Sequence, residues 1–174
     1  MTDAKSNILL IGMPGSGKST VGVLLAKMTG KGFMDTDLLI QSETGASLQR
    51  IVDTRGYEVL REEEERVLCG LEASNQVIAT GGSAVYSDAA MAHLHQDSVI
   101  VFLNVSLETV RQRIGDYSLR GISKRPDQTL EDLYEERLAL YQQYADIIVD
   151  GDGRTLAQVC EAMQTVLAGN ATML

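Results

Sequence analysis

The segment Gly12-Met13-Pro14-Gly15-Ser16-Gly17-Lys18-Ser19 decides the fold of this chain, because it fits the pattern G-x-x-x-x-G-K-[ST] of a phosphate-binding loop. The apolar run Ile8 to Ile11 comes before it and predicts a strand, and residues 18–28 have the apolar spacing of a helix. Glycines allow the backbone N–H groups to curl around a phosphate, and the helix N-terminus adds positive dipole. We expect Lys18 to reach the β- and γ-phosphates of a nucleotide and the Ser19 hydroxyl to bind Mg²⁺.

Short apolar runs alternate with helical patterns along the rest of the chain. The strand-like runs cover residues 8–11, 33–36, 77–80, 98–103 and 147–149. The helical patterns cover residues 18–28, 47–73, 107–114, 130–144 and 156–167. Continuous apolar strands separated by helices predict an α/β fold, in which helices cover both faces of a parallel sheet. Ligands of such sheets bind beyond the carboxyl ends of the strands, so the informative residues should follow the strands.

Length and composition exclude several classes of protein. The chain has 174 residues, which suits one domain, and a formal charge of −9, which disfavours binding to nucleic acid. It has no apolar run long enough for a signal peptide or a membrane helix. Cys69 and Cys160 are too few for a disulfide framework, and their apolar surroundings predict core packing. We expect a cytoplasmic monomer without nucleic-acid or membrane partners.

A phosphate loop does not identify the reaction, because switches, motors and small-molecule kinases share it. Asp53-Thr54-Arg55-Gly56 matches the D-x-x-G of GTPase switches, but Leu48, Ile51 and Val52 before it have helical spacing, and no N-K-x-D occurs. We interpret Asp53 as a residue near a helix end. Motors and large ATPases need a longer chain. A kinase with a small acceptor remains.

Residues on the acceptor side follow the second and third strands. Asp35 is predicted to hold Mg²⁺ directly or through water, and Asp37 to accept a hydrogen bond from an acceptor hydroxyl. The alternative for Asp37 is a helix N-cap. Gly81 and Gly82 permit a close approach of the backbone to a ligand, with an ordinary tight turn as the alternative.

Basic side chains supply the candidate anion contacts of this acidic chain. Arg61 precedes a run of glutamates, so it is either a clamp for a carboxylate or an exposed arginine of a solvated helix. The helical spacing of Arg137 between tyrosines suggests a partly buried face. Residues 115–127 include Arg120, Lys124 and Arg125 and predict either a lid over the transferred phosphate or a basic surface loop.

Together, these motifs resemble the shikimate kinases, a family with the nucleoside-monophosphate-kinase-like P-loop fold. The resemblance runs from about Asn7 to Leu167. Besides the phosphate loop, it rests on Phe33-Met34-Asp35-Thr36-Asp37, Leu60-Arg61 with the glutamates after it, Val77 to Gly82, and Glu136 to Tyr141 followed by Ala145-Asp146.

The resemblance implies a three-layer αβα domain over residues 1–174, with a five-stranded parallel sheet in the order 2-3-1-4-5. It implies a substrate-binding helical region at about residues 37–75 and a lid at about 115–127. The implied activity is Mg²⁺- and ATP-dependent phosphorylation of a ring hydroxyl of shikimate, an anionic small molecule, to shikimate 3-phosphate on the route to aromatic amino acids.

The resemblance also implies roles for individual residues, at the positions where this sequence matches the motifs of the family. Lys18, Asp37 and Arg120 are the implied catalytic residues, and Ser19 and Asp35 the implied Mg²⁺ ligands. The implied shikimate contacts are Asp37, Arg61, Gly81, Gly82 and Arg137. The implied ATP contacts are Gly12, Pro14, Gly15, Ser16, Gly17, Lys18, Ser19, Thr20, Arg120 and, by a loose match near adenine, Arg154.

Two positions depart from the family pattern. The family usually has three glycines where this chain has Gly81-Gly82-Ser83, and the usual Arg-Pro of the lid reads Arg120-Gly121 here, with Arg125-Pro126 later. Both changes affect the acceptor pocket or its cover. A kinase for another hydroxy acid, polyol or nucleotide, and a non-catalytic nucleotide-binding protein, therefore remain as alternatives.

Overall fold

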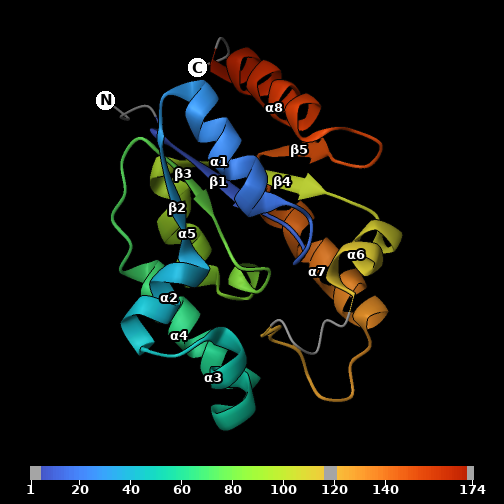
Figure 1. Ribbon diagram of the computed structural model, residues 1–174. Coiled ribbons are helices and arrows are strands. Elements are labelled where there is room, and N and C mark those ends of the chain that lie inside the picture. Colours follow the sequence, from blue (N-terminus) through green and yellow to red (C-terminus); the bar gives the residue numbers. More distant parts are fainter. Residues whose placement is uncertain (1–4, 116–120, 172–174) are drawn as a thin grey trace.

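The apolar runs form one parallel sheet in the computed structural model, which describes residues 5–115 and 121–171 (Figure 1). The strands are β1 (Asn7–Ile11), β2 (Gly32–Asp35), β3 (Gln76–Ala79), β4 (Ser98–Asn104) and β5 (Ile147–Asp150). Every neighbouring pair is parallel, and the order is β2-β3-β1-β4-β5. The expected fold class and strand order are confirmed.

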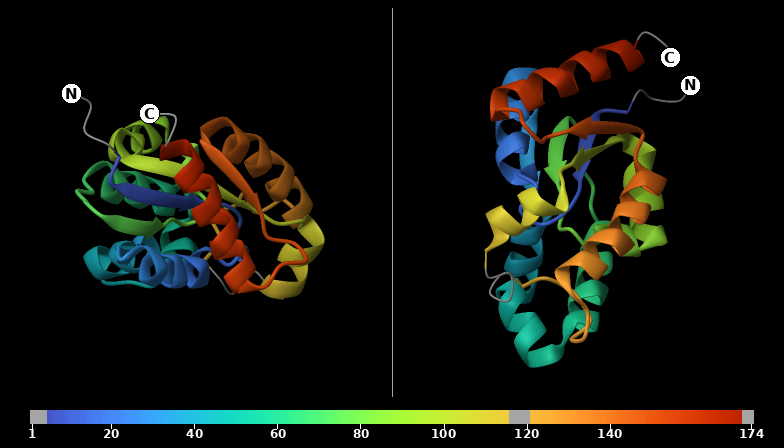
Figure 2. Two further views of the ribbon diagram at one scale, coloured as in Figure 1. Left: turned by 90° about the horizontal axis from the view of Figure 1, so that it is seen from above. Right: turned by 90° about the vertical axis from the view of Figure 1, so that its right-hand side faces the viewer.

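Helices cover the two faces of this sheet and extend past one end of it. They are α1 (Lys18–Thr29), α2 (Thr36–Thr44), α3 (Leu48–Arg55), α4 (Tyr57–Cys69), the 3₁₀ turn η1 (Ala84–Tyr86), α5 (Asp88–Asp97), α6 (Leu107–Ile114), α7 (Leu130–Tyr144) and α8 (Leu156–Ala171). Figure 2 shows α1 and α8 together on one side of the sheet and α5 and α7 on the other.

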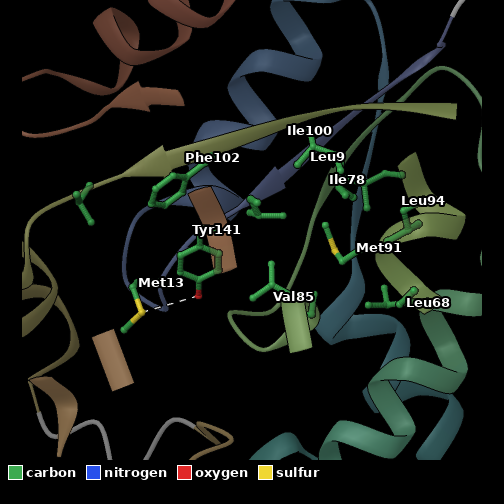
Figure 3. Close-up of a cluster of buried hydrophobic side chains, with 14 of the residues drawn as sticks. Leu9, Met13, Leu68, Ile78, Val85, Met91, Leu94, Ile100, Phe102 and Tyr141 are labelled. Carbon is green, nitrogen blue, oxygen red and sulfur yellow. Dashed lines mark hydrogen bonds between the residues drawn. The ribbon is translucent and has the colours of Figure 1, made fainter. Parts of the chain in front are cut away.

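The alternation of side chains along β1 explains how both faces are buried. Leu9 and Ile11 pack toward α5 and α7, whereas Ile8 and Leu10 pack toward α1 and α8. Figure 3 shows the first of these clusters, in which the ring centroids of Phe102 and Tyr141 lie 5.1 Å apart. A strand that is buried on both faces must be apolar throughout, and this is why the runs were visible in the sequence.

The region expected as one helical stretch at residues 47–73 contains two helices. Gly56 ends α3 with a φ of 92°, a left-handed conformation that disfavours other residues. With α2, the two helices bury a small core of their own around Ile40, Ile51 and Leu60. This unit lies beyond the end of the sheet at the bottom of Figure 1.

Two further features differ from the expectations. Helix α5 had not been expected, although Ser87 caps it and its buried residues Ala90, Met91 and Leu94 have helical spacing. Cys160 is buried as expected, but Cys69 is exposed at the end of α4, so the prediction of core packing was wrong for Cys69.

Within the described part of the chain, no helix is long and apolar enough to cross a membrane.

Candidate active site

The phosphate-binding loop connects β1 to α1, as the motif requires. Its glycines adopt positive φ angles, 149° at Gly12 and 77° at Gly15. A Cβ atom at Gly12 would lie 2.8 Å from the backbone oxygen of Leu103, so only glycine fits beside β4. The loop therefore has the curled backbone that a phosphate cradle needs.

Lys18 is buried at the start of α1 and folds over this loop. Its Nζ donates to the backbone oxygens of Gly12 at 2.7 Å and Met13 at 2.8 Å. Burial lowers the pKa of Lys18 to about 8, against the opposing effect of Asp37. The amine is thus held beside the loop and has lost much of its hydration, so a phosphate near it would interact strongly with its charge.

Ser19 and Asp35 come together from α1 and β2. The Ser19 hydroxyl donates to Asp35 Oδ2 at 2.8 Å. A hydroxyl and a carboxylate are hard oxygen donors, as Mg²⁺ prefers, and Mg²⁺ usually takes only one or two carboxylates besides water and phosphate oxygens. The described residues hold no cluster of three or more acidic, histidine or cysteine side chains that could hold a metal.

Asp35, the last residue of β2, and Asp37, in the first turn of α2, have different roles. Asp35, and not Asp37, caps α2, because its Oδ1 accepts the backbone N–H of Asp37 at 2.9 Å. The N-cap alternative for Asp37 is therefore wrong, and its carboxylate lines the central cavity. Burial, followed by the negative charge of Asp35, raises the pKa of Asp37 to about 6.

Gly81 and Gly82 lie where site side chains approach the backbone most closely. A Cβ atom at Gly81 would lie 2.6 Å from both Asp37 Oδ1 and Glu64 Oε2. A Cβ atom at Gly82 would lie 2.6 Å from Arg137 Nη1. The glycines after β3 are needed for these approaches, which an ordinary tight turn would not require.

The predicted pair of arginines converges from α4 and α7. Arg137 Nη2 donates to the backbone oxygen of Ser123 at 2.6 Å, and Arg61 Nη2 donates to the same oxygen at 3.4 Å. Arg61 Nε also donates to the Ser123 hydroxyl at 2.8 Å. Arg137 is 1% exposed and Arg61 is half-buried, so the solvated-helix alternative for Arg61 is wrong.

Neither guanidinium forms an ion pair with a carboxylate in the described part of the chain. The ion pairs there involve Lys5, His95 and other arginines, and none includes Arg61 or Arg137. The carboxylates of Glu64 and Glu136 interact electrostatically with the pair but form no ion pair with it, so two guanidinium groups that meet at one oxygen atom make a candidate site for an anion.

A cavity of about 350 Å³ joins the phosphate loop to this site. Most of the predicted residues line it: Pro14, Gly15, Gly17, Lys18, Ser19, Thr20, Asp37, Gly82 and Arg137. Arg61 lines a neighbouring cavity, with Glu64 and Tyr86, and shares the Ser123 oxygen with Arg137. Lys18 and Arg137 therefore share one cavity, and Arg61 lies at its margin.

A second cavity of about 300 Å³ opens on the other side of the phosphate loop. Arg154, whose assignment was loose, lines it together with Ser16. Arg113, which had not been predicted, also lines it and donates to the backbone oxygen of Ser16 at 2.9 Å. The neighbouring Arg111 instead pairs with Glu131, and no pattern in the sequence distinguished the two arginines.

Glu64 and Ser83 are two further site residues that had not been assigned. The Ser83 hydroxyl donates to Glu64 Oε1 at 2.5 Å, and both residues line the central cavity. Burial raises the pKa of Glu64 to about 7, although the hydrogen bond from Ser83 opposes the shift. Glu64 follows Arg61 by three positions and Leu60 by four, so helical spacing could have placed it on the inner face of α4.

The predicted lid is described only in part. Arg120 lies outside the described residues, so its predicted contact with the phosphates remains a prediction. Gly121, Ile122 and Ser123 line the central cavity without forming a helix or strand. Arg125 pairs with Glu136 at 3.4 Å on the surface.

A phosphate loop whose cavity ends at buried guanidinium groups defines the class of P-loop kinases that act on small molecules. Comparisons with known proteins identify the family within this class. A shikimate kinase family model matches residues 14–168. The shikimate kinase of Rippkaea orientalis is 38% identical over 92% of this chain and 89% of its own length. That of Thiobacillus denitrificans is 35% identical over 98% of this chain and 92% of its own length.

Solved structures agree with these relatives. The shikimate kinase from Acinetobacter baumannii in complex with shikimate superposes with a TM-score of 0.87, at 29% identity over 97% of this chain and 96% of that chain. The shikimate kinase from Aquifex aeolicus superposes with a TM-score of 0.82, at 35% identity over 95% of this chain and 98% of that chain. This chain belongs to the shikimate kinase family.

Proposed function

We propose that the protein transfers the γ-phosphoryl group of ATP to a ring hydroxyl of shikimate, giving shikimate 3-phosphate and ADP. The observation that carries the proposal is the convergence of Arg61 and Arg137 on one oxygen atom, at the margin of the cavity that Lys18 lines. A carboxylate oxygen of shikimate at the place of the Ser123 oxygen would receive both guanidinium groups, and guanidinium is well suited to binding carboxylates.

ATP binds with its phosphates in the loop from Gly12 to Ser19. Lys18 neutralises charge on the β- and γ-phosphates, and the base extends into the second cavity, toward Arg113 and Arg154. Ser19 and Asp35 hold Mg²⁺, which supplies charge neutralisation at the phosphate oxygens when bound. Arg120 is assigned to the transferring phosphate by its resemblance to the lid arginine of the family.

Shikimate binds between α4, α7 and the turn after β3. Arg61 and Arg137 take its carboxylate, and Gly81 and Gly82 let Asp37 and Arg137 lie against the backbone beside the ring. Asp37 accepts the proton of the attacking hydroxyl as the new O–P bond forms and the bond to the β–γ bridging oxygen breaks. Its raised pKa improves this role, because a base is most effective when its pKa is close to the working pH.

Two segments complete this proposal. The unit of α2, α3 and α4 forms the substrate-binding region predicted at about residues 37–75. Residues 115–127 form the lid, whose described part already contacts both guanidinium groups through Ser123. Release of the Ser123 oxygen is the movement that frees the arginines for shikimate.

A coupled assay of ADP release tests the proposal. Purified protein with ATP and Mg²⁺ should show saturable turnover with shikimate and little with gluconate, glycerol or nucleoside monophosphates. Lys18→Ala should abolish turnover. Preferred turnover of another acceptor would identify a kinase of different specificity, and ATP binding without turnover of any acceptor would identify a nucleotide-binding protein.

A further inference from the structure

Tyr86, at the end of η1, contacts both guanidinium groups of the predicted clamp. The Cζ atom of Arg61 lies 3.8 Å from the centroid of its ring, and the Cζ atom of Arg137 lies 5.4 Å from it. Arg137 Nε donates to the Tyr86 hydroxyl at 3.4 Å. One side chain thus connects two arginines that belong to different helices.

The ring of Tyr86 is held on a rigid element. The N–H of Tyr86 donates to the backbone oxygen of Ser83 at 3.1 Å, and Ala84 and Val85 are each 1% exposed within the main core cluster. The other group that both arginines contact, Ser123, belongs to a segment without helix or strand. Tyr86 is therefore the fixed contact of the pair, and Ser123 is the one that can be exchanged for a ligand.

The chemistry of a tyrosine suits this position between two cations. The face of its ring attracts the guanidinium of Arg61, because the ring quadrupole places negative charge there. Its hydroxyl oxygen accepts from Arg137, and its hydroxyl proton is directed to Glu136. Burial raises the pKa of Glu136, but the hydrogen bonds from Tyr86 and Gln128 lower it below its ordinary value. Ring face and hydroxyl together offset the mutual repulsion of the arginines.

We propose that Tyr86 is a positioning residue that holds Arg61 and Arg137 in the arrangement that binds the acceptor carboxylate. This inference rests on the proposed function. Because the arginines are already oriented, the carboxylate binds without the entropy loss of ordering two long side chains. The arginines hold the carboxylate equally in the ground state and in the transition state. Their orientation by Tyr86 therefore lowers KM for shikimate and leaves kcat unchanged.

Three variants separate the ring face, the hydroxyl and a general packing role. Tyr86→Leu keeps an apolar side chain but removes the ring face, and should raise KM for shikimate about 5- to 20-fold with kcat and KM for ATP within about twofold. Tyr86→Phe keeps the ring face and removes only the hydroxyl, and it should raise KM for shikimate less than about threefold. Tyr144→Leu is the matched control, because Tyr144 bonds to Asp88 and has no hydrogen bond or ring contact with either arginine in the part of the chain that the structure describes. It should leave every kinetic constant unchanged.

A double-mutant cycle with Arg61→Ala shows whether Tyr86 acts through the arginine. In the Arg61→Ala background, Tyr86→Leu should raise KM for shikimate less than it does in the wild type. Equal effects in both backgrounds, an unchanged KM in Tyr86→Leu, or a fall in kcat and Tm alone would overturn the positioning role. If the wild-type protein showed no turnover of shikimate, the proposed function and this inference would both fail.

Discussion

Replacement of Arg137 by methionine should change stability and acceptor binding in opposite ways. Arg137 is 1% exposed, and no ion pair with a carboxylate forms around it among the described residues. Its hydrogen-bond partners include the backbone oxygen of Ser123 and the hydroxyls of Tyr86 and Tyr141. Methionine retains most of the volume and removes a buried charge. Replacement of a buried ion pair by apolar side chains is often neutral or stabilising, by about 1–4 kcal/mol, and we expect removal of this buried charge without an ion pair to act in the same direction.

Arg137→Met also removes the charge-assisted contact between the guanidinium and the carboxylate of the acceptor. Loss of one buried contact of this kind should cost about 2–4 kcal/mol of binding free energy. At 1.4 kcal/mol per tenfold, this corresponds to an increase of about 30- to 700-fold in KM for shikimate. KM for ATP should stay within about threefold, because Arg137 does not line the second cavity.

Initial rates from the ADP-release assay give the two KM values, and urea titration gives the free energy of unfolding. Arg111→Met is the matched control, because Arg111 pairs with Glu131 on the surface, and it should change neither quantity measurably. The reasoning is refuted if Arg137→Met binds shikimate as the wild type does, or if it loses several kcal/mol of stability.

Three further predictions follow from the contacts and pKa shifts of the site. Gly82→Ala should lower kcat/KM for shikimate by about tenfold or more, since the new Cβ would lie 2.6 Å from Arg137 Nη1. The control Gly169→Ala adds a Cβ in open space and should leave kcat/KM unchanged. Circular dichroism should show that both variants are folded. Asp37 must be deprotonated to accept a proton, and its pKa is raised to about 6, so kcat/KM should fall as the pH drops below about 6. Asp37→Asn should lose about 10²- to 10⁴-fold in kcat above pH 6 and should not show this fall at lower pH, and a pH profile of both proteins checks this. Glu64 has a folded-state pKa of about 7, above its ordinary value of 4.5, so protonation stabilises the fold below pH 4.5 and this contribution is lost as the pH rises toward 7. The wild type should therefore become less stable relative to Glu64→Gln between pH 5 and pH 8 in urea titrations, and a constant difference would contradict the assigned shift.

Much of the fold could be predicted because its elements carry local signals. Buried strands must be apolar along their whole length, and α7 occupies the residues expected from helical spacing, 130–144. The division of residues 47–73 depended on Gly56, since a single glycine is compatible with a helix until its backbone is known to adopt a left-handed conformation.

The site residues that lie next to a recognisable strand or helix could be predicted from the sequence. Asp35 and Asp37 follow a strand, so their place at the edge of the sheet was inferred correctly, but which of them caps α2 depends on backbone angles. Glu64 had a readable signal in its spacing from Leu60. Tyr86 and Arg113 had none, because their partners lie far away in the chain.

The sequence by itself determined the phosphate loop, because eight consecutive residues, with their glycine conformations and the start of α1, specify that geometry without distant contacts. Only the tertiary structure decided that Arg61 and Arg137 meet at one oxygen atom and share the side chain of Tyr86. The packing of α4, α7 and η1 around a common core brings these groups together, and such packing is a property of the folded chain as a whole.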